Sequence, residues 1–198
     1  MMLCRLLEDL DCTLVQGRSD IEVNAICCDS RSVTPGCVFV CLPGQHTDGR
    51  RFAHAAAAAG AAVLVFEGTL PSFEFSQSCS PALVQAEPGK TRRVLALMAS
   101  RLYGYPARRM TMIGITGTKG KTTTSYFTQA LINAVSGGKA ALFSSVDNCL
   151  DGHTYVESDL TTPESMDAFR MMREAADNGM KYLVMEVSSQ AYKVDRVY

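Results

Sequence analysis

The segment at residues 110–136 limits the possible folds of this chain more than any other. An apolar stretch, MTMIGIT, is followed by the glycine-rich sequence GTKGK and then by the predicted helix TTTSYFTQALINAV. A strand that runs through a glycine loop into a helix brings backbone N–H groups and the positive end of the helix dipole to one place, where an anion can bind. The order of these elements therefore predicts an α/β fold with a phosphate-binding loop.

The glycine spacing departs from the strict pattern G-x-x-x-x-G-K-[ST], because Gly114, Gly117 and Gly120 produce G-x-x-G-x-x-G-K-T. Glycines at these positions would let the backbone approach a phosphate without a Cβ in the way. Lys121 would reach the β- and γ-phosphates, and Thr122 would place a hydroxyl on Mg²⁺. The alternative is a glycine turn with solvated lysines. The flanking strand and helix favour a site for nucleotide phosphates.

Glu186 stands at the end of another predicted strand, KYLVMEVSS. In open α/β sheets, ligands bind beyond the carboxyl ends of the strands. The carboxylate of Glu186 could therefore hold Mg²⁺ together with Thr122 and the phosphates. A glutamate that faces water at a strand end is the alternative, but the buried character of YLVM favours a functional charge.

The alternation of strands and helices predicts two α/β domains, at residues 1–107 and 108–198, with the boundary in the basic, proline-containing stretch YPARRM. In the second domain, strands at 110–116, 139–145 and 181–189 alternate with helices at 120–135 and 163–179, as at the start of a doubly wound parallel sheet. Residues 147–164 are predicted to form a loop. Since a parallel sheet of three strands leaves its faces poorly covered, we expect the chain to end partway through this domain.

Composition excludes several classes of protein. Lys and Arg total 19 against 20 Asp and Glu, which argues against a general nucleic-acid binder. The eight cysteines form no C-x-x-C and are accompanied by three histidines, so zinc sites and a disulfide scaffold are not expected. Reduced thiols in a cytoplasmic protein are the simpler interpretation. We find neither a signal peptide nor an apolar run long enough to span a membrane.

Four motifs together resemble the Mur ligases, the ATP-dependent amino-acid ligases of peptidoglycan synthesis, and most of all their MurE branch. GITGTKGKTTT resembles the ATP loop of the family, in which the longer glycine spacing is normal. CCDSRSVTPGCVFVCLPGQHTDGRRF resembles the uridine-binding domain, DLTTPE the N-T-T-P segment, and MEVSSQAYKVDRV the M-E-V-S-S-H segment. The resemblance covers nearly the whole chain, in the same order.

The resemblance implies roles for particular residues. Lys121 and Glu186 would be catalytic, and Thr122 and Glu186 would hold Mg²⁺. ATP would be bound by Gly117, Thr118, Lys119, Gly120, Lys121, Thr122 and Thr123. UDP-MurNAc-L-Ala-D-Glu would be bound by Cys28, Ser30, Gln45, His46, Thr47, Thr161, Thr162, Ser188 and Arg196.

The implied reaction adds a diamino acid, L-lysine or meso-diaminopimelate, through an acyl phosphate, and we expect a monomeric enzyme that serves cell-wall biogenesis, cell shape and cell division. Three positions depart from the family pattern: Leu160 replaces asparagine, Gln190 replaces histidine, and Lys119 replaces a common asparagine. The C-terminal domain and the carbamylated lysine of the family would follow Tyr198, so we expect the 198-residue chain alone to be inactive. Another ligase of the superfamily, such as MurF, and a non-catalytic nucleotide-binding remnant remain alternatives.

Overall fold

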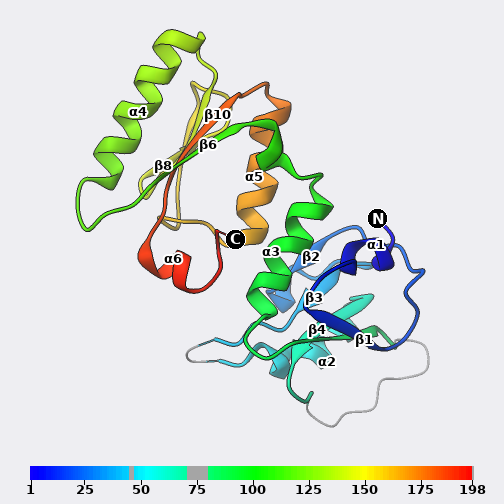
Figure 1. Ribbon diagram of the computed structural model, residues 1–198. Helices are drawn as coiled ribbons and strands as arrows, with labels where there is room; N and C mark the ends of the chain where they lie inside the picture. Colours follow the sequence, from blue (N-terminus) through cyan, green and yellow to red (C-terminus); the bar gives the residue numbers. More distant parts are fainter. Residues whose placement is uncertain (45–46, 71–79, 198) are drawn as a thin grey trace. The chain divides into compact units, whose positions relative to one another are not determined.

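The computed structural model describes residues 1–44, 47–70 and 80–197, which form two compact units, Met1–Met98 and Ala99–Tyr198. Each unit is of the α/β class and contains its own β-sheet of parallel and antiparallel strands (Figure 1). The division falls within helix α3 (Thr91–Leu102). The domain boundary predicted from the sequence, near residue 107, lies after this helix, in the short 3-10 helix η3 (Pro106–Arg109).

The first unit is built on a five-stranded sheet of order β1-β5-β4-β3-β2, in which all neighbours are parallel except β1 and β5. Its strands are β1 (Cys12–Gln16), β2 (Ile26–Cys27), β3 (Val38–Val40), β4 (Val63–Glu67) and β5 (Ala82–Ala86). Its helices are α1 (Leu3–Leu7), η1 (Ser30–Ser32), η2 (Gly49–Phe52), α2 (Ala53–Ala58) and the first part of α3. The central strands β3 and β4 are buried almost throughout, as continuous apolar runs in a parallel sheet should be.

Two segments of this unit differ from what the sequence predicts. The β-rich segment IEVNAICCDS (residues 21–30) predicts a strand, but only the two residues of β2 form one, because Asp29 begins a turn. Strand β1 was not predicted, since it is short and pairs antiparallel to β5 at the edge of the sheet, with mostly exposed side chains. Pairing with a distant strand decides the structure of such a segment, and local sequence does not show it.

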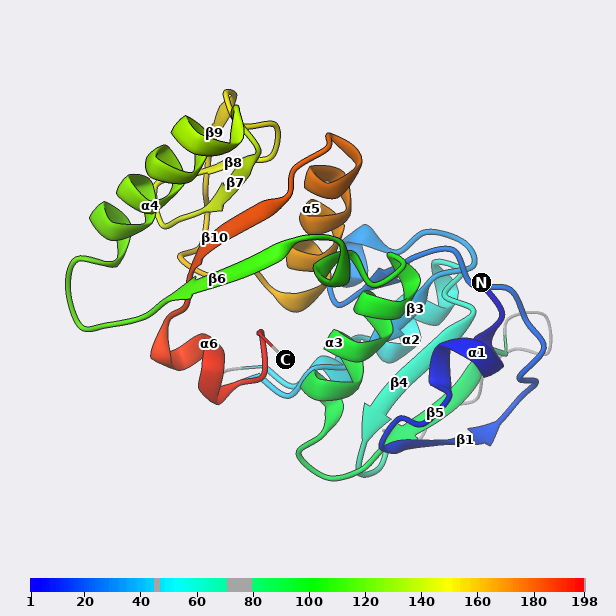
Figure 2. The same ribbon diagram turned by 45° about the horizontal axis from the view of Figure 1, so that its top comes forward.

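The second unit contains the strand–loop–helix that the sequence predicts. Its sheet has the order β6-β10-β7-β8-β9, and β10 pairs in parallel with both β6 and β7. The elements are β6 (Thr111–Ile115), α4 (Lys121–Ser136), β7 (Ala140–Phe143), β8 (Asp147–Cys149), β9 (Tyr155–Glu157), α5 (Ser165–Asp177), β10 (Tyr182–Glu186) and α6 (Ser189–Lys193). Helices α4 and α5 cover opposite faces of this sheet (Figures 1 and 2). The start of a doubly wound sheet is therefore confirmed.

The expected loop at residues 147–164 is wrong in its first part. Strands β8 and β9 form an antiparallel extension of the sheet beyond β7, so the sheet has five strands among the described residues instead of three. The polar residues Asp147 and Asn148 suggested a loop, because such residues are depleted in strands. Their pairing with β7 and β9 overrides that preference.

The strand order brings the glycine loop and the carboxyl end of β10 together. Since β10 lies between β6 and β7, its carboxyl end, at Glu186, is the neighbour of the strand that enters the glycine loop. Ile115 and Glu186 are direct partners in the parallel register. Parallel strands end at the same edge of a sheet, so the glycine loop and Glu186 lie at one edge.

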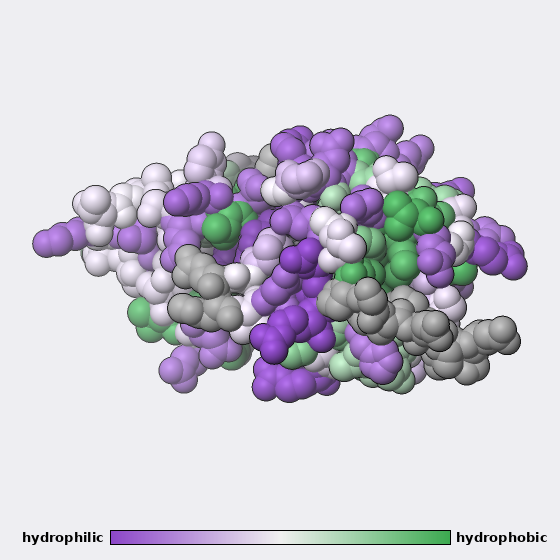
Figure 3. Space-filling model, turned by 90° about the horizontal axis from the view of Figure 1, so that it is seen from below, coloured by the Kyte–Doolittle hydropathy of each residue, from purple (hydrophilic) through white to green (hydrophobic). Residues whose placement is uncertain are grey.

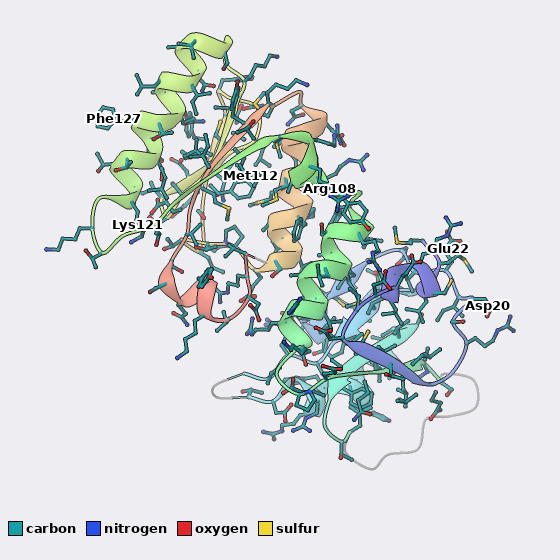
Figure 4. All side chains as sticks on the ribbon, viewed as in Figure 1. Asp20, Glu22, Arg108, Met112, Lys121 and Phe127 are labelled. Atoms are coloured by element: carbon teal, nitrogen blue, oxygen red, sulfur yellow. The ribbon has the colours of Figure 1, made fainter. Side chains whose placement is uncertain are left out.

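Helix α4 has an apolar outer face. Phe127, Leu131 and Val135 recur at i, i+4 and i+8 and are exposed. Phe127 points away from the sheet (Figure 4). The glycine pair at residues 137 and 138 predicts the end of this helix, and Gly137, at a φ of 70°, does end it.

Two leucines of this unit give a matched test of the core. Leu142 is fully buried with Cys149 and Val184, whereas Leu131 is 69% exposed. We expect Leu142→Ala to lower the free energy of unfolding by about 2–5 kcal/mol, because it leaves a cavity, and Leu131→Ala to change it by less than about 0.5 kcal/mol. Urea unfolding of both variants measures the difference. Equal losses would contradict the packing described for β7.

Hydrophilic and apolar residues are interspersed on the face of the molecule shown in Figure 3. Among the described residues, no helix is long and apolar enough to cross a membrane.

Candidate nucleotide-binding site

The glycine loop owes its shape to backbone conformation. Gly117 and Gly120 have φ values of 152° and 78°, which side chains rarely adopt. A Cβ at Gly120 would meet nothing within 4 Å, so the need for glycine comes from φ and not from crowding. Gly120 is the N-cap of α4 and turns the chain from the loop into the helix.

The first turn of α4 offers free donors. Among the described residues, no hydrogen-bond partner is found for the N–H groups of Lys121, Thr122 and Thr123, and the first N–H paired within the helix is that of Thr124, which bonds to Gly120 O. Such unpaired N–H groups, with the positive end of the helix dipole, attract anions.

The two loop lysines differ. Lys121 lies at the beginning of α4 (Figure 4), and its Nζ donates a hydrogen bond of 3.0 Å to Gly117 O, so the side chain folds back over the loop. Thr118 and Lys119 are exposed at the tip of the loop. Of these two lysines, Lys121 is therefore the one held over the loop.

Glu186 is buried, with 1% of its surface exposed, so the interpretation as a water-facing glutamate is wrong. Its Oε2 accepts a hydrogen bond of 3.2 Å from the hydroxyl of Thr122, the residue with which the sequence pairs it. The structure thus brings together two oxygen atoms that could bind a metal ion, one from α4 and one from β10. Hydroxyl and carboxylate oxygens are ligands that Mg²⁺ prefers, so this donor set fits the ion.

Ser145 was not recognised from the sequence. It follows β7, and its N–H and hydroxyl both donate to Glu186 Oε1, at 3.0 and 3.2 Å. Its hydroxyl also lies 3.0 Å from that of Thr122. The signal that could have found it is its place after a buried strand, at the same sheet edge as Glu186.

The residues expected to bind the peptide end lie around the carboxyl end of β10. Thr162, 1% exposed, donates to Glu186 O at 3.0 Å and accepts from Ser188 N at 3.1 Å. The Ser188 hydroxyl accepts from Ala191 N and caps α6. Thr161 is half-buried beside Thr162.

Arg196 is already paired in this structure. Its Nη2 lies 2.6 Å from Glu164 Oε1, and Nη1 donates to Thr162 O at 3.4 Å. The hydroxyl of Ser165 donates to Arg196 O at 3.1 Å, which ties the chain after α6 to the start of α5. Arg196 therefore lies beside Thr162, but its guanidinium is engaged by a carboxylate.

In the first unit, the D-S-R motif forms a local turn. The Asp29 carboxylate accepts from Arg31 N at 2.9 Å and pairs with the Arg31 guanidinium, which lowers the pKa of Asp29 to about 2. Cys28 and Ser30 flank this aspartate and are half-buried. The motif therefore shapes the chain that carries the two residues predicted to bind uridine.

The D-G-R-R-F motif forms a turn of the same kind, in which an aspartate binds the arginine two residues later. Asp48 accepts from Arg50 N at 3.0 Å and pairs with its guanidinium, whose Nη1 donates to Glu67 O and Thr69 O. A hollow of about 180 Å³ lies here, lined by Cys41, Pro43, Asp48, Arg50, Glu67, Gly68 and Pro88. Thr47 is exposed beside it, and Gln45 and His46 lie outside the described residues.

Comparison with known proteins identifies both units. The Mur ligase family catalytic domain matches residues 22–99, and the Mur ligase middle domain matches residues 115–198. The chain is 64% identical over 171 residues to the UDP-N-acetylmuramyl-tripeptide synthetase of Bifidobacterium longum, a match that covers 86% of this chain and 31% of that protein.

More distant relatives differ in the amino acid that they are named for. The UDP-N-acetylmuramoyl-L-alanyl-D-glutamate--L-lysine ligase of Enterococcus faecalis is 39% identical over 94% of this chain and 35% of its own length. The corresponding 2,6-diaminopimelate ligase of Clostridium botulinum is 36% identical over 100% of this chain and 40% of its own length. The chain thus spans about a third of the length of the curated relatives it matches.

Solved structures agree on the fold. A UDP-N-acetylmuramoyl-L-alanyl-D-glutamate--2,6-diaminopimelate ligase superposes with a TM-score of 0.73 at 20% identity, covering 100% of this chain and 38% of that protein. MurF from Acinetobacter baumannii has a TM-score of 0.61 at 19% identity, covering 95% of this chain and 36% of that protein. With the two domain matches in order along the sequence, the chain belongs to the Mur ligase family.

Proposed function

We propose that the full-length protein is an ATP-dependent ligase of the MurE type, which joins a diamino acid to UDP-MurNAc-L-Ala-D-Glu in peptidoglycan synthesis. The observation that carries this proposal is the approach of Glu186 to Thr122 beside the free N–H groups of α4. The relatives support the substrate class, because their names specify tripeptide synthetases and ligases of UDP-N-acetylmuramoyl-L-alanyl-D-glutamate.

The residues fit a bound triphosphate. The N–H groups of Lys121, Thr122 and Thr123 would bind phosphate oxygens, and Lys121 would exchange its bond to Gly117 O for the γ-phosphate. Thr122 and Glu186 would hold Mg²⁺, which would neutralise charge on the β- and γ-phosphates. Gly117, Thr118, Lys119 and Gly120 complete the loop around the phosphates.

The proposed reaction has two steps. A carboxylate oxygen of the D-glutamate side chain attacks the γ-phosphorus, the bond to the bridging oxygen breaks, and ADP leaves. The amine of the diamino acid then attacks the acyl carbon, loses a proton and displaces phosphate, which forms the amide. In the first step Lys121 and the α4 N–H groups stabilise the charge that develops on the transferred phosphoryl group.

The remaining residues would bind the UDP-MurNAc-dipeptide. Cys28, Ser30, Gln45, His46 and Thr47 would contact the nucleotide and sugar, and Thr161, Thr162, Ser188 and Arg196 the peptide end. To contact the peptide end, the Arg196 guanidinium would have to bind it in addition to Glu164 or break its ion pair with Glu164. We propose a monomeric enzyme of a reducing, cytoplasmic compartment; the seven described cysteines form no disulfide with one another.

The test is ligation by the full-length protein with L-lysine and with meso-diaminopimelate in separate reactions. We expect ADP release that requires both UDP-MurNAc-L-Ala-D-Glu and one of the two diamino acids, and a product heavier by that residue in mass spectrometry. ADP release supported by the UDP-MurNAc-tripeptide and D-alanyl-D-alanine instead would identify a MurF-type enzyme. Absence of ADP release with every substrate pair would favour a non-catalytic remnant.

A further inference from the structure

Ser145 connects the two residues proposed to hold the metal. It lies in the turn after β7, where no recognised motif falls. Ser144 fixes this turn, because its hydroxyl donates to Asp147 O at 2.8 Å and accepts from the N–H groups of Val146 and Asp147. Ser145 is thus presented to Glu186 by a locally rigid stretch of chain.

The two carboxylate oxygens of Glu186 have different partners. Oε1 accepts both the N–H and the hydroxyl of Ser145, whereas the hydroxyl of Thr122 is the one donor to Oε2 among the residues that the structure describes. A buried carboxylate needs such bonds to offset the loss of water. Ser145 therefore fixes the rotation of the carboxylate and leaves Oε2 on the side of the glycine loop.

The contacts among the Thr122 hydroxyl, the Ser145 hydroxyl and the Glu186 carboxylate outnumber the hydrogens that can form them. Thr122 Oγ1, Ser145 Oγ and the carboxylate make three O···O contacts of 3.0 to 3.2 Å, but two hydroxyls supply only two hydrogens. One contact must therefore oppose two lone pairs. A cation that accepts these lone pairs would remove the repulsion between them. With Mg–O distances of about 2.0–2.1 Å, adjacent oxygens around an octahedral Mg²⁺ are about 2.9 Å apart.

We propose that Ser145 is a positioning residue of the metal site, which orients Glu186 through its hydroxyl so that Oε2 and Thr122 can bind Mg²⁺ together. This inference rests on the proposed function, since it assumes that the site holds a magnesium nucleotide. Residues that orient a metal ligand change metal affinity by about 10–100-fold when they are replaced. The effect should therefore appear in metal dependence, and not in the binding of nucleotide without metal.

The test compares Ser145→Thr with Ser145→Val, which have the same shape but differ in the hydroxyl. In the full-length protein, the affinity for a fluorescent ATP analogue is measured in EDTA and across a series of Mg²⁺ concentrations. We expect Ser145→Val to raise the Mg²⁺ concentration for half-maximal binding by about 10-fold or more, with affinity in EDTA within about 2-fold of wild type. Ser145→Thr should stay close to wild type, as should the control Ser158→Ala, because the Ser158 hydroxyl donates to Leu160 O in an exposed loop.

Each other result has a separate meaning. Equal Mg²⁺ dependence of the threonine and valine variants would overturn the role of the hydroxyl. A loss of affinity that is equal with and without Mg²⁺ would mean that Ser145 supports only the fold. If the wild-type protein bound no analogue under any condition, the proposed nucleotide site itself would fail.

Discussion

Replacing Lys121 by alanine is expected to lower ADP release by the full-length protein about 10²–10³-fold, the loss typical for one group that stabilises a developing oxyanion. The reason is geometric: Lys121 is the loop lysine whose ammonium group is held over the loop, 3.0 Å from Gly117 O. The bond to Gly117 holds the ammonium group over the loop that leads into the unpaired N–H groups of α4. Steady-state ADP release at saturating substrates measures the effect.

The matched control for this variant is Lys181→Ala. Lys181 is exposed immediately before β10, five residues before Glu186, which lies at the opposite end of that strand. Removal of this charge should leave ADP release within about 2-fold of wild type, since an exposed charge so far from the loop is screened. An unchanged rate in Lys121→Ala would show that the loop does not bind the transferred phosphate, and the ATP-loop assignment would be wrong.

Gly152→Ala is expected to lower the free energy of unfolding by about 3 kcal/mol. Two costs add at this position. Gly152 has a φ of +86°, which alanine adopts only with strain, and its Cβ would lie 2.5 Å from Gly138 O. The clash is with backbone, so it cannot be relieved by rotation of a side chain, and the turn between β8 and β9 would have to move away from the end of α4.

Gly179→Ala separates the two costs. Gly179 has nearly the same φ, +84°, but nothing lies within 4 Å of its would-be Cβ. We expect a loss of about 1–2 kcal/mol there, from backbone strain alone. Thermal or urea unfolding of both variants gives the comparison. If the two alanine variants lost equal stability, the close approach of the β8–β9 turn to Gly138 would be contradicted.

The sequence predicted most of the second unit because its signals are local. The strand, the glycine loop and the helix of residues 110–136 follow one another directly, and Gly137 ends the helix where expected. Glu186 was recognised from its place at the end of an apolar strand. Its burial and its bond to Thr122 depend on β10 lying between β6 and β7, an order that local patterns do not encode.

The elements that were missed depend on distant partners. β1 exists because it pairs with β5, about 70 residues away along the chain, and β8 and β9 exist because β7 provides an edge. Ser145 was missed for the same reason: a serine after a strand is common, and only the fold brings it to Glu186. Arg196 was recognised from a motif that predicts substrate binding, but the motif gives no sign of the ion pair between Arg196 and Glu164.

The central claim is that the edge formed by the glycine loop, Thr122 and Glu186 binds a magnesium nucleotide. A crystal structure with Mg²⁺ and a non-hydrolysable ATP analogue tests it most directly. We predict phosphate oxygens within hydrogen-bonding distance of the N–H groups of Lys121, Thr122 and Thr123. The metal should lie about 2.0–2.1 Å from Thr122 Oγ1 and Glu186 Oε2. An analogue bound elsewhere, or a loop that stays empty at saturating concentration, would contradict the account.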